Sequence, residues 1–160
     1  RNPHSLVKDL DIPLGKALQI VACSELGRRF FQKNYSSLPT IRTASEVYDY
    51  VSDMHYLSKE HLRGIYLNAH YKVIHDEIIS IGTVDANIIH PREVFKPALE
   101  HSAVALILVH NHPSGVTTPS EADVAVTLQL INAGKLLGVD LIDHVIVTKD
   151  SFLSVPASYH

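Results

Sequence analysis

The chain has 160 residues, of which 46% are hydrophobic and 19% are charged, a balance typical of a globular protein with one buried core. Its net charge of −3 argues against a broad phosphate-binding surface, and its apolar runs are too short to cross a bilayer. Cys23 is the single cysteine, which excludes an internal disulfide and a thiolate zinc finger. We therefore expect a cytoplasmic protein with no membrane partner.

Residues 1–40 are expected to form a helical lead-in and a linker. Apolar side chains recur at helical spacing from Pro13 to about Lys33, which predicts one helix there. The following segment, Asn34–Thr40, is rich in turn-forming residues and predicts a connection. We place a domain boundary at this point, with the main domain over residues 41–160.

The main domain is predicted to begin with a helix and two strands. Either Thr43 or Ser45 is suited to cap a helix that continues through Tyr56. Two strands, His61–Leu67 and Val73–Ile81, then flank a short turn. This spacing predicts an antiparallel pair.

The second half of the main domain alternates helices and strands. A long loop, Gly82–His90, leads to a helix that starts at Pro91, a residue favoured at the first helical position. A strand over Ala103–Val109, a helix over Ala122–Gly138 and a strand over Leu141–Thr148 follow. The alternation predicts a three-layer α/β arrangement around a mixed sheet.

Two histidines close the apolar strand of this second half. Since side chains alternate along a strand, His110 and His112 leave the same face while Asn111 points away. A proline and a glycine then end the strand, and a helix starts near Ser120. Asp123 lies on the first turn of that helix, so the spacing predicts that it meets the two imidazoles.

Two neutral imidazoles and one carboxylate are a common zinc ligand set, and three protein ligands leave the fourth tetrahedral position for water. An open position of this kind indicates a catalytic site rather than a structural one. Ser120 and Asp123 also fit a plain helix cap, and for these two residues alone the two interpretations are equally good. The histidine pair favours the metal site because packing does not explain its spacing.

Cleavage of an amide bond with activated water also requires a carboxylate that moves a proton to the leaving nitrogen. Periodicity does not choose among the candidate glutamates, which are Glu60, Glu77, Glu93, Glu100 and Glu121. By its polar neighbours alone, Glu60 is a solvated residue at the entry to a strand.

The histidine motif is one of several blocks that resemble a known family. His110–Gly115 with Ser120 and Asp123 looks like the signature of the RadC family, a bacterial branch of the JAMM (MPN+) metalloprotease-like superfamily. Further blocks resemble this family in the expected order, at residues 60–68, 82–84, 90–96, 133–138 and 143–147. Residues 12–17 and 25–29 resemble the tail of the helix-hairpin-helix-like region that precedes the catalytic domain in this family.

The resemblance implies a fold, a site and an activity. It implies a JAMM/MPN-like domain of cytidine-deaminase-like architecture with a short N-terminal helical segment. It implies that His110, His112 and Asp123 bind Zn²⁺, that Glu60 is the general acid/base and that Ser120 stabilises the oxyanion. The implied protein is a zinc-dependent metallopeptidase-like hydrolase, in which metal-activated water attacks a peptide or isopeptide (amide) carbonyl of a peptide or protein substrate.

Three other classes of protein are alternatives to this interpretation of the sequence. The family's traditional name points to a DNA-repair-associated accessory protein that binds nucleic acid and has a structural or vestigial metal; the net acidity counts against it. Salt-dependent DNA binding that a Glu60→Gln change leaves intact would favour that class. A zinc deaminase is rejected because it requires a Pro-Cys-x-x-Cys segment. A noncatalytic interaction module predicts no bound metal.

Overall fold

The computed structural model describes residues 3–36, 38–82 and 89–155, and it describes their side chains except those of residues 28–36. Residues 83–88, which make up most of the predicted loop between the hairpin and the next helix, lie outside this description. The chain divides into two compact units, Arg1–Leu38 and Pro39–His160. Each unit is described by itself.

The N-terminal unit consists of two helices, α1 (Pro3–Leu10) and α2 (Leu14–Ser36), and buries Leu6 and Ala17. The predicted helix is confirmed as α2, but it continues to Ser36, into the segment predicted as a linker. Asparagine and serine lower helix stability only slightly, whereas the first residue that blocks a helix is Pro39. No described helix combines the length and the apolar character needed to span a bilayer.

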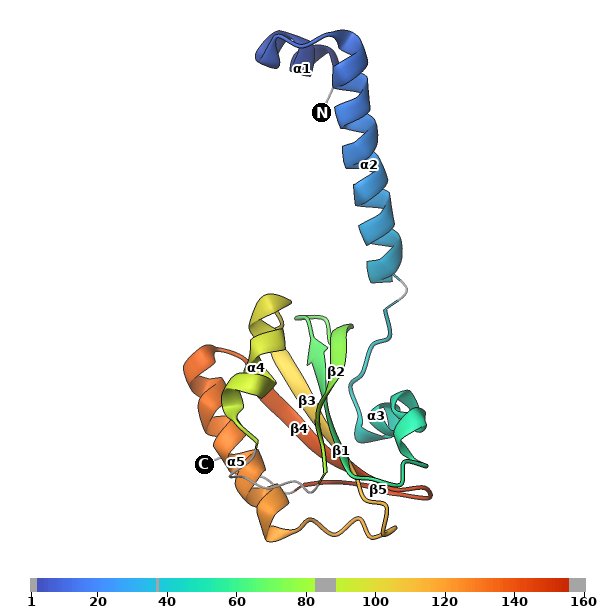
Figure 1. The fold of residues 1–160 in the computed structure, drawn as a ribbon, viewed down its shortest axis with the longest axis vertical. Coiled ribbons are helices and arrows are strands. Elements are labelled where there is room, and N and C mark those ends of the chain that lie inside the picture. The colour runs from blue at the N-terminus through green and yellow to red at the C-terminus, as the bar shows by residue number, and fades with distance from the viewer. Residues whose placement is uncertain (1–2, 37, 83–88, 156–160) are drawn as a thin grey trace. The chain divides into compact units, whose positions relative to one another are not determined.

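The C-terminal unit is built on one mixed sheet (Figure 1). Its five strands are β1 (His61–Leu67), β2 (Val73–Ile81), β3 (Ala105–Asn111), β4 (Asp140–Val147) and β5 (Phe152–Ser154), in the order β2-β1-β3-β4-β5. The β3–β4 pair is parallel and the other pairs are antiparallel. The predicted hairpin is confirmed as β1 and β2.

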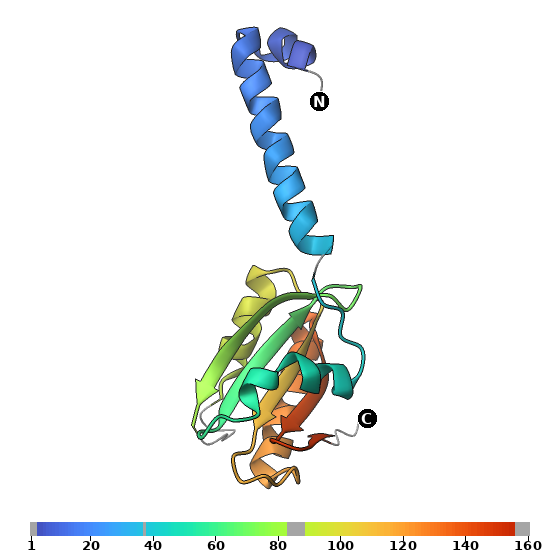
Figure 2. The same ribbon diagram turned by 90° about the vertical axis from the view of Figure 1, so that its right-hand side faces the viewer.

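Helices cover both faces of the sheet. α4 (Pro91–Glu100) and α5 (Glu121–Leu137) lie on one face, and α3 (Ala44–Tyr50) with the short 3-10 helix η1 (Ser52–Met54) lies on the other (Figures 1 and 2). The core accordingly has two parts, one beneath α4 and α5 and one beneath α3. The predicted three-layer α/β fold with a mixed sheet is confirmed.

Two predicted elements differ in their bounds. The first helix of the domain is capped by Thr43, one of the two predicted caps, but it ends at Tyr50 and not at Tyr56. The tighter 3-10 turn follows as Val51 and Met54 enter the core. The strand predicted from the apolar run Ala103–Val109 and the two histidines begins at Ala105 and ends at Asn111 as β3, because β1 and β4 pair with it on both sides up to that point.

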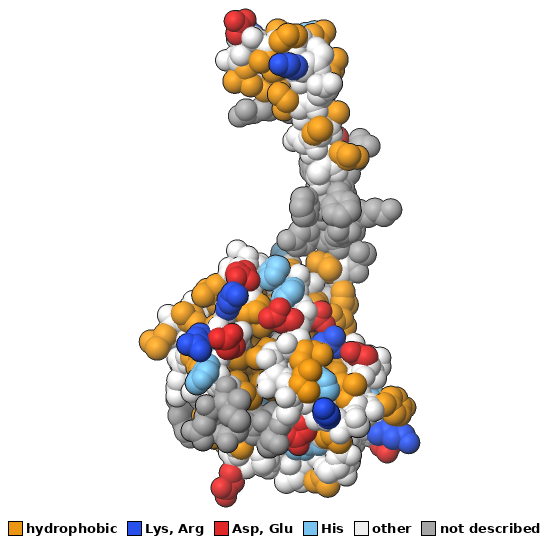
Figure 3. All heavy atoms as spheres, in the orientation of Figure 1, with side chains coloured by type: hydrophobic (Ala, Val, Ile, Leu, Met, Phe, Trp, Pro, Cys, Tyr) orange, Lys and Arg blue, Asp and Glu red, His pale blue; other side chains and the backbone are white. Residues whose placement is uncertain are grey.

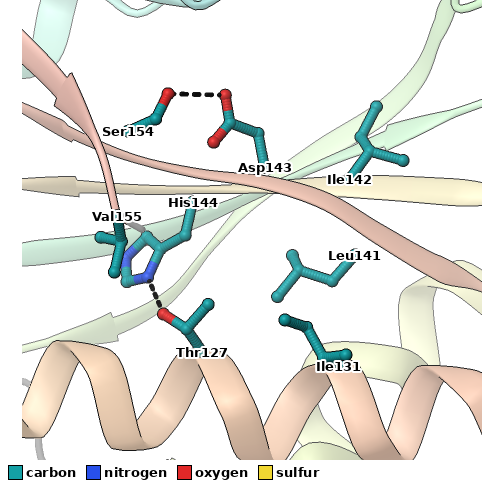
Figure 4. Close-up of a pocket in the computed structure, with 8 residues that line it drawn as sticks. All are labelled: Thr127, Ile131, Leu141, Ile142, Asp143, His144, Ser154 and Val155. Atoms are coloured by element: carbon teal, nitrogen blue, oxygen red, sulfur yellow. Dashed lines mark hydrogen bonds between the residues drawn. The ribbon is translucent and has the colours of Figure 1, made fainter. Parts of the chain in front are cut away.

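The register of β3 and β4 contains one irregularity. Leu106 pairs with Leu141 and Ile107 pairs with Asp143, so Ile142 is an additional residue in β4. Figure 4 shows Ile142 and Asp143 on one side of β4 and Leu141 and His144 on the other. This β-bulge turns His144 toward α5.

Candidate metal centre

The candidate site lies where the end of β3 meets the start of β1 and the first turn of α5. His110 is the last but one residue of β3 and pairs with Leu62 of β1, and Glu60 directly precedes that strand. His112 follows β3, and Asp123 is the third residue of α5. The structure therefore brings together four residues that lie as far as 63 positions apart in the sequence.

Short distances connect these four side chains. His110 Nδ1 lies 3.0 Å from Asp123 Oδ1, and His112 Nε2 lies 3.7 Å from Asp123 Oδ2. On its other side, His110 Nε2 lies 3.8 Å from Glu60 Oε2. The two imidazole rings meet edge to face with their centroids 4.5 Å apart. His110 thus stands between two carboxylates.

Glu60, His110 and His112 can hold a metal ion. Each offers one ligand atom, and the three atoms lie within 4.8 Å of one another. His110 Nε2 is buried and has no hydrogen-bond partner, a costly state unless another group satisfies it. Imidazole nitrogens and a carboxylate oxygen suit a divalent transition metal. The residues present therefore fit a metal ion, although this group takes its carboxylate from Glu60, whereas the sequence prediction took it from Asp123.

Asp123 is held beside the histidines by the helix cap. The backbone N–H and the hydroxyl of Ser120 both donate to Asp123 Oδ2, at 2.8 and 2.7 Å, and the Asp123 N–H donates back to Ser120 Oγ at 3.1 Å. The capping interpretation of these two residues is therefore confirmed. Burial alone would raise the pKa of Asp123, but the hydrogen bonds from His110 and Ser120 outweigh it and hold this pKa below its usual range.

The turn after β3 fixes the ring of His112. His112 Nδ1 lies 2.7 Å from the carbonyl oxygen of Val116, and because a carbonyl only accepts, Nδ1 carries the proton. Gly115 supports this turn with a φ of 80° and donates its N–H to the His112 carbonyl. In the neutral ring, Nε2 is then the nitrogen without a proton, and it is the atom that can bind a metal ion.

A second buried histidine lies behind the site. His144 Nδ1 lies 2.7 Å from the Thr127 hydroxyl (Figure 4). This hydroxyl donates to the Asp123 carbonyl at 2.6 Å. Thr127 and His144 also line a cavity of about 290 Å³. Burial lowers the pKa of His144 to about 3, so this ring is neutral at physiological pH.

The sequence analysis did not identify Thr127 as a residue of this site. Asp143, which precedes His144 in β4, faces away from α5 because of the bulge and accepts a hydrogen bond from Ser154. Thr127 lies one helical turn after Asp123, a spacing that puts both side chains on the same face of α5. The four-residue spacing from Asp123 to Thr127 is the sequence feature that could have identified Thr127.

The structure shows which of the five candidate glutamates lies at the histidine site. Glu60 alone belongs to the histidine group among the described residues. Glu77 pairs with His75, and the exposed pairs Arg92–Glu93 and Lys96–Glu100 lie on α4. Glu121 is exposed at the first residue of α5.

The structure is a three-layer α/β domain with two histidines and a carboxylate at one end of a mixed sheet, where they could hold a metal ion. Comparison with known proteins agrees with this class. The family model described as the RadC-like JAB domain matches residues 41–159, and the chain belongs to this family.

Related proteins support the assignment over most of the chain. A UPF0758 protein of Geobacillus thermodenitrificans is 47% identical over 141 residues, which are 88% of this chain and 62% of the relative. UPF0758 proteins of Methanococcoides burtonii and Bacillus cereus are 44% and 40% identical over 96% and 98% of this chain, and cover 68% and 70% of those relatives. The chain therefore spans between about three fifths and seven tenths of the length of these relatives.

Proposed function

We propose that this domain is a zinc-dependent hydrolase that cleaves a peptide or isopeptide bond in a peptide or protein substrate. The observation that carries the proposal is the buried, unpartnered Nε2 atom of His110, which faces Glu60. The same ring contacts Asp123 through Nδ1 and lies edge to face against His112. Cysteine usage agrees with a reducing, cytoplasmic environment, because Cys23 is free.

The histidine pair and Asp123 would hold the metal ion. The lowered pKa of Asp123 keeps its carboxyl ionised, and a neutral imidazole offers one unprotonated nitrogen, so all three side chains have a form that binds a cation. When bound, zinc would polarise the scissile carbonyl and lower the pKa of a water molecule in the site. The protein's own contribution is to hold these donors at the dry end of the sheet, where His110 and Asp123 are almost fully buried.

Glu60 is the group that moves the proton in this proposal. Its carboxylate is 31% exposed, so it reaches both the buried histidines and a substrate in solvent. It takes a proton from the attacking water and delivers it to the leaving nitrogen. Ser120 would donate to the developing oxyanion, which requires its hydroxyl to release Asp123 Oδ2 by rotation of the side chain.

Surface charge supports a peptide substrate over nucleic acid. Figure 3 shows Lys and Arg side chains of the C-terminal unit interspersed with Asp and Glu on the face in view. Such a surface supplies little of the sequence-independent attraction for phosphate that nucleic-acid binding requires. The observation agrees with the net charge of −3.

The test is elemental analysis of the purified protein. We expect about one zinc per chain, lost in His112→Ala and Asp123→Ala and retained in the control His75→Ala, whose imidazole stacks on His101 outside the site. The protein is then screened with zinc in excess against peptide and isopeptide substrates. Glu60→Gln keeps both histidines and Asp123, so it should still bind zinc under these conditions and lose activity. Absence of metal after zinc is supplied would refute the proposal.

A further inference from the structure

Asn111 stands between the two histidines of the motif and faces the opposite way. It is the last residue of β3, and only 2% of its side chain is exposed. Because strand side chains alternate, His110 faces α5 while Asn111 faces the segment that leads into β1. A buried carboxamide must find partners for both its oxygen and its nitrogen.

The partners of Asn111 all lie in the segment over residues 57–61. The His61 N–H donates to Asn111 Oδ1 at 2.7 Å. Asn111 Nδ2 donates to the Lys59 carbonyl at 3.0 Å, with a longer contact of 3.5 Å to the Leu57 carbonyl. A flipped carboxamide would place N–H against N–H and oxygen against oxygen, so these contacts allow one orientation only.

These hydrogen bonds bracket Glu60 on both sides along the chain. The Glu60 carbonyl also accepts a hydrogen bond from the Gly82 N–H at 2.9 Å, so its backbone is fixed. Its carboxylate, in contrast, has no hydrogen bond to any described residue, and Glu60 Oε2 lies 3.8 Å from His110 Nε2. The place of the carboxylate therefore depends on how the backbone on either side of it is held.

We infer that Asn111 is a positioning residue, which holds the 57–61 segment so that the Glu60 carboxylate stays opposite His110. The inference rests on the metal centre of the proposed function and adds a role for the residue between the histidines. One tripeptide, His110–His112, then serves two purposes: its outer residues bind the ion and its middle residue sets the distance to the glutamate.

The test is a double-mutant cycle between Asn111→Ala and Glu60→Ala, with Co²⁺ and Zn²⁺ as probes. Metal affinity and the visible absorption of bound Co²⁺ are measured for the wild type, both single variants and the double variant. Removing a residue that orients a metal-site group costs about 10- to 100-fold in metal affinity, and we expect a loss in this range for Asn111→Ala. In the Glu60→Ala background the same change should have less than about a 2-fold effect, because the group it positions is gone.

Two controls separate positioning from folding. Asn68→Ala removes a carboxamide that accepts from the His70 and Lys72 N–H groups at the other end of β1, and it should leave Co²⁺ binding and absorption unchanged. Asn111→Asp keeps the size and the acceptor for His61 but loses the donor to Lys59. It should show a smaller loss than Asn111→Ala, and it replaces the alanine variant if that does not fold.

Hydrogen exchange gives a readout that needs no metal. The His61 amide should exchange faster in Asn111→Ala than in the wild type, while amides in the middle of β3 are unchanged. Equal losses of affinity in both Glu60 backgrounds, or an unchanged His61 amide, would overturn the inference. A wild-type protein that binds neither ion would instead overturn the proposed function, while the exchange experiment would still decide whether Asn111 holds the segment.

Discussion

The two halves of α5 contact the same sheet by different means. The C-terminal half buries Leu130 and Ile131 in the apolar core, and Gly134 approaches the chain so closely that an added Cβ would collide with the Val139 carbonyl. The N-terminal half instead places Asp123 and Thr127 against histidines of β3 and β4. One helix therefore has an apolar contact and a polar contact about two turns apart.

The comparison separates what stabilises the fold from what prepares the site. Apolar burial is favourable wherever shapes fit, whereas a buried polar group contributes only if it is paired. The two histidines that face the polar half of α5, His110 and His144, each have an Nε2 atom with no hydrogen-bond partner among the described residues. We expect substitutions in the apolar half to change stability alone, and substitutions in the polar half to change metal binding or pH dependence as well.

The largest effect on stability is expected in the apolar half. Leu130→Ala should lower the free energy of unfolding by about 2–5 kcal/mol, because Leu130 is fully buried and alanine leaves a cavity. Urea denaturation measures the loss, with Leu136→Ala, on the exposed face of the same helix, as a control expected to change it by less than about 0.5 kcal/mol. Folded Leu130→Ala that failed to bind metal would contradict the separation of the two halves.

The polar half should respond to Thr127→Val, which keeps the shape and removes the hydroxyl. The variant leaves His144 Nδ1 without its partner, and we expect a loss of about 1–3 kcal/mol in the same denaturation experiment. His144→Leu in the same chain should remove most of that cost, because the orphaned donor is then absent. Additive losses in the double variant would show that the two side chains are not coupled.

Acid should destabilise the protein through His144. In the unfolded chain this histidine binds a proton near its ordinary pKa of 6.5, whereas burial lowers the pKa in the folded protein to about 3. Between these values the unfolded state binds more protons, so stability falls as the pH falls, by up to about 1.4 kcal/mol per pH unit. Denaturation with a chelator present, from pH 6.5 to 4.5, should give a shallower dependence for His144→Leu and an unchanged one for Leu130→Ala.

The smallest effect on stability is expected at the helix caps, where the chain offers a matched pair. Ser120 on α5 and Thr43 on α3 both form a capping box, and replacing either with alanine should cost about 1 kcal/mol. Only Ser120→Ala should also change zinc affinity, since Ser120 donates to Asp123 while Thr43 contacts Glu46. Equal zinc affinities in the two variants would mean that the cap has no part in the site.

Much of the fold was predictable because the strongest patterns are local. The hairpin of β1 and β2 and the helix that begins at Pro91 follow from alternation, turn residues and a favoured first residue. The meeting of His110 with Asp123 followed from strand alternation and helix spacing. In contrast, the end of β3 depended on pairing with two other strands, which no local pattern contains.

The parts of the site that escaped prediction depend on contacts distant in sequence. Glu60 could be selected only through a family resemblance, since its carboxylate meets His110 across 50 residues of chain. Thr127 was missed because its value lies in a bond to His144 on another element. The role of Asn111 was missed because its partners, the His61 N–H and the Lys59 carbonyl, lie in the segment around Glu60 at the start of β1 and not in the histidine motif.

The bulge in β4 uncouples the length of this strand from the direction in which His144 faces. With Ile142 and Asp143 on the same side, a strand one residue shorter at this point would still present Leu141 and His144 to α5. No bulge follows His144 in β4, so adding or removing one residue there would turn the following side chains to the opposite face of the sheet. Relatives of this domain should therefore tolerate the loss of one residue between Leu141 and His144 and exclude a one-residue change of length in β4 after His144.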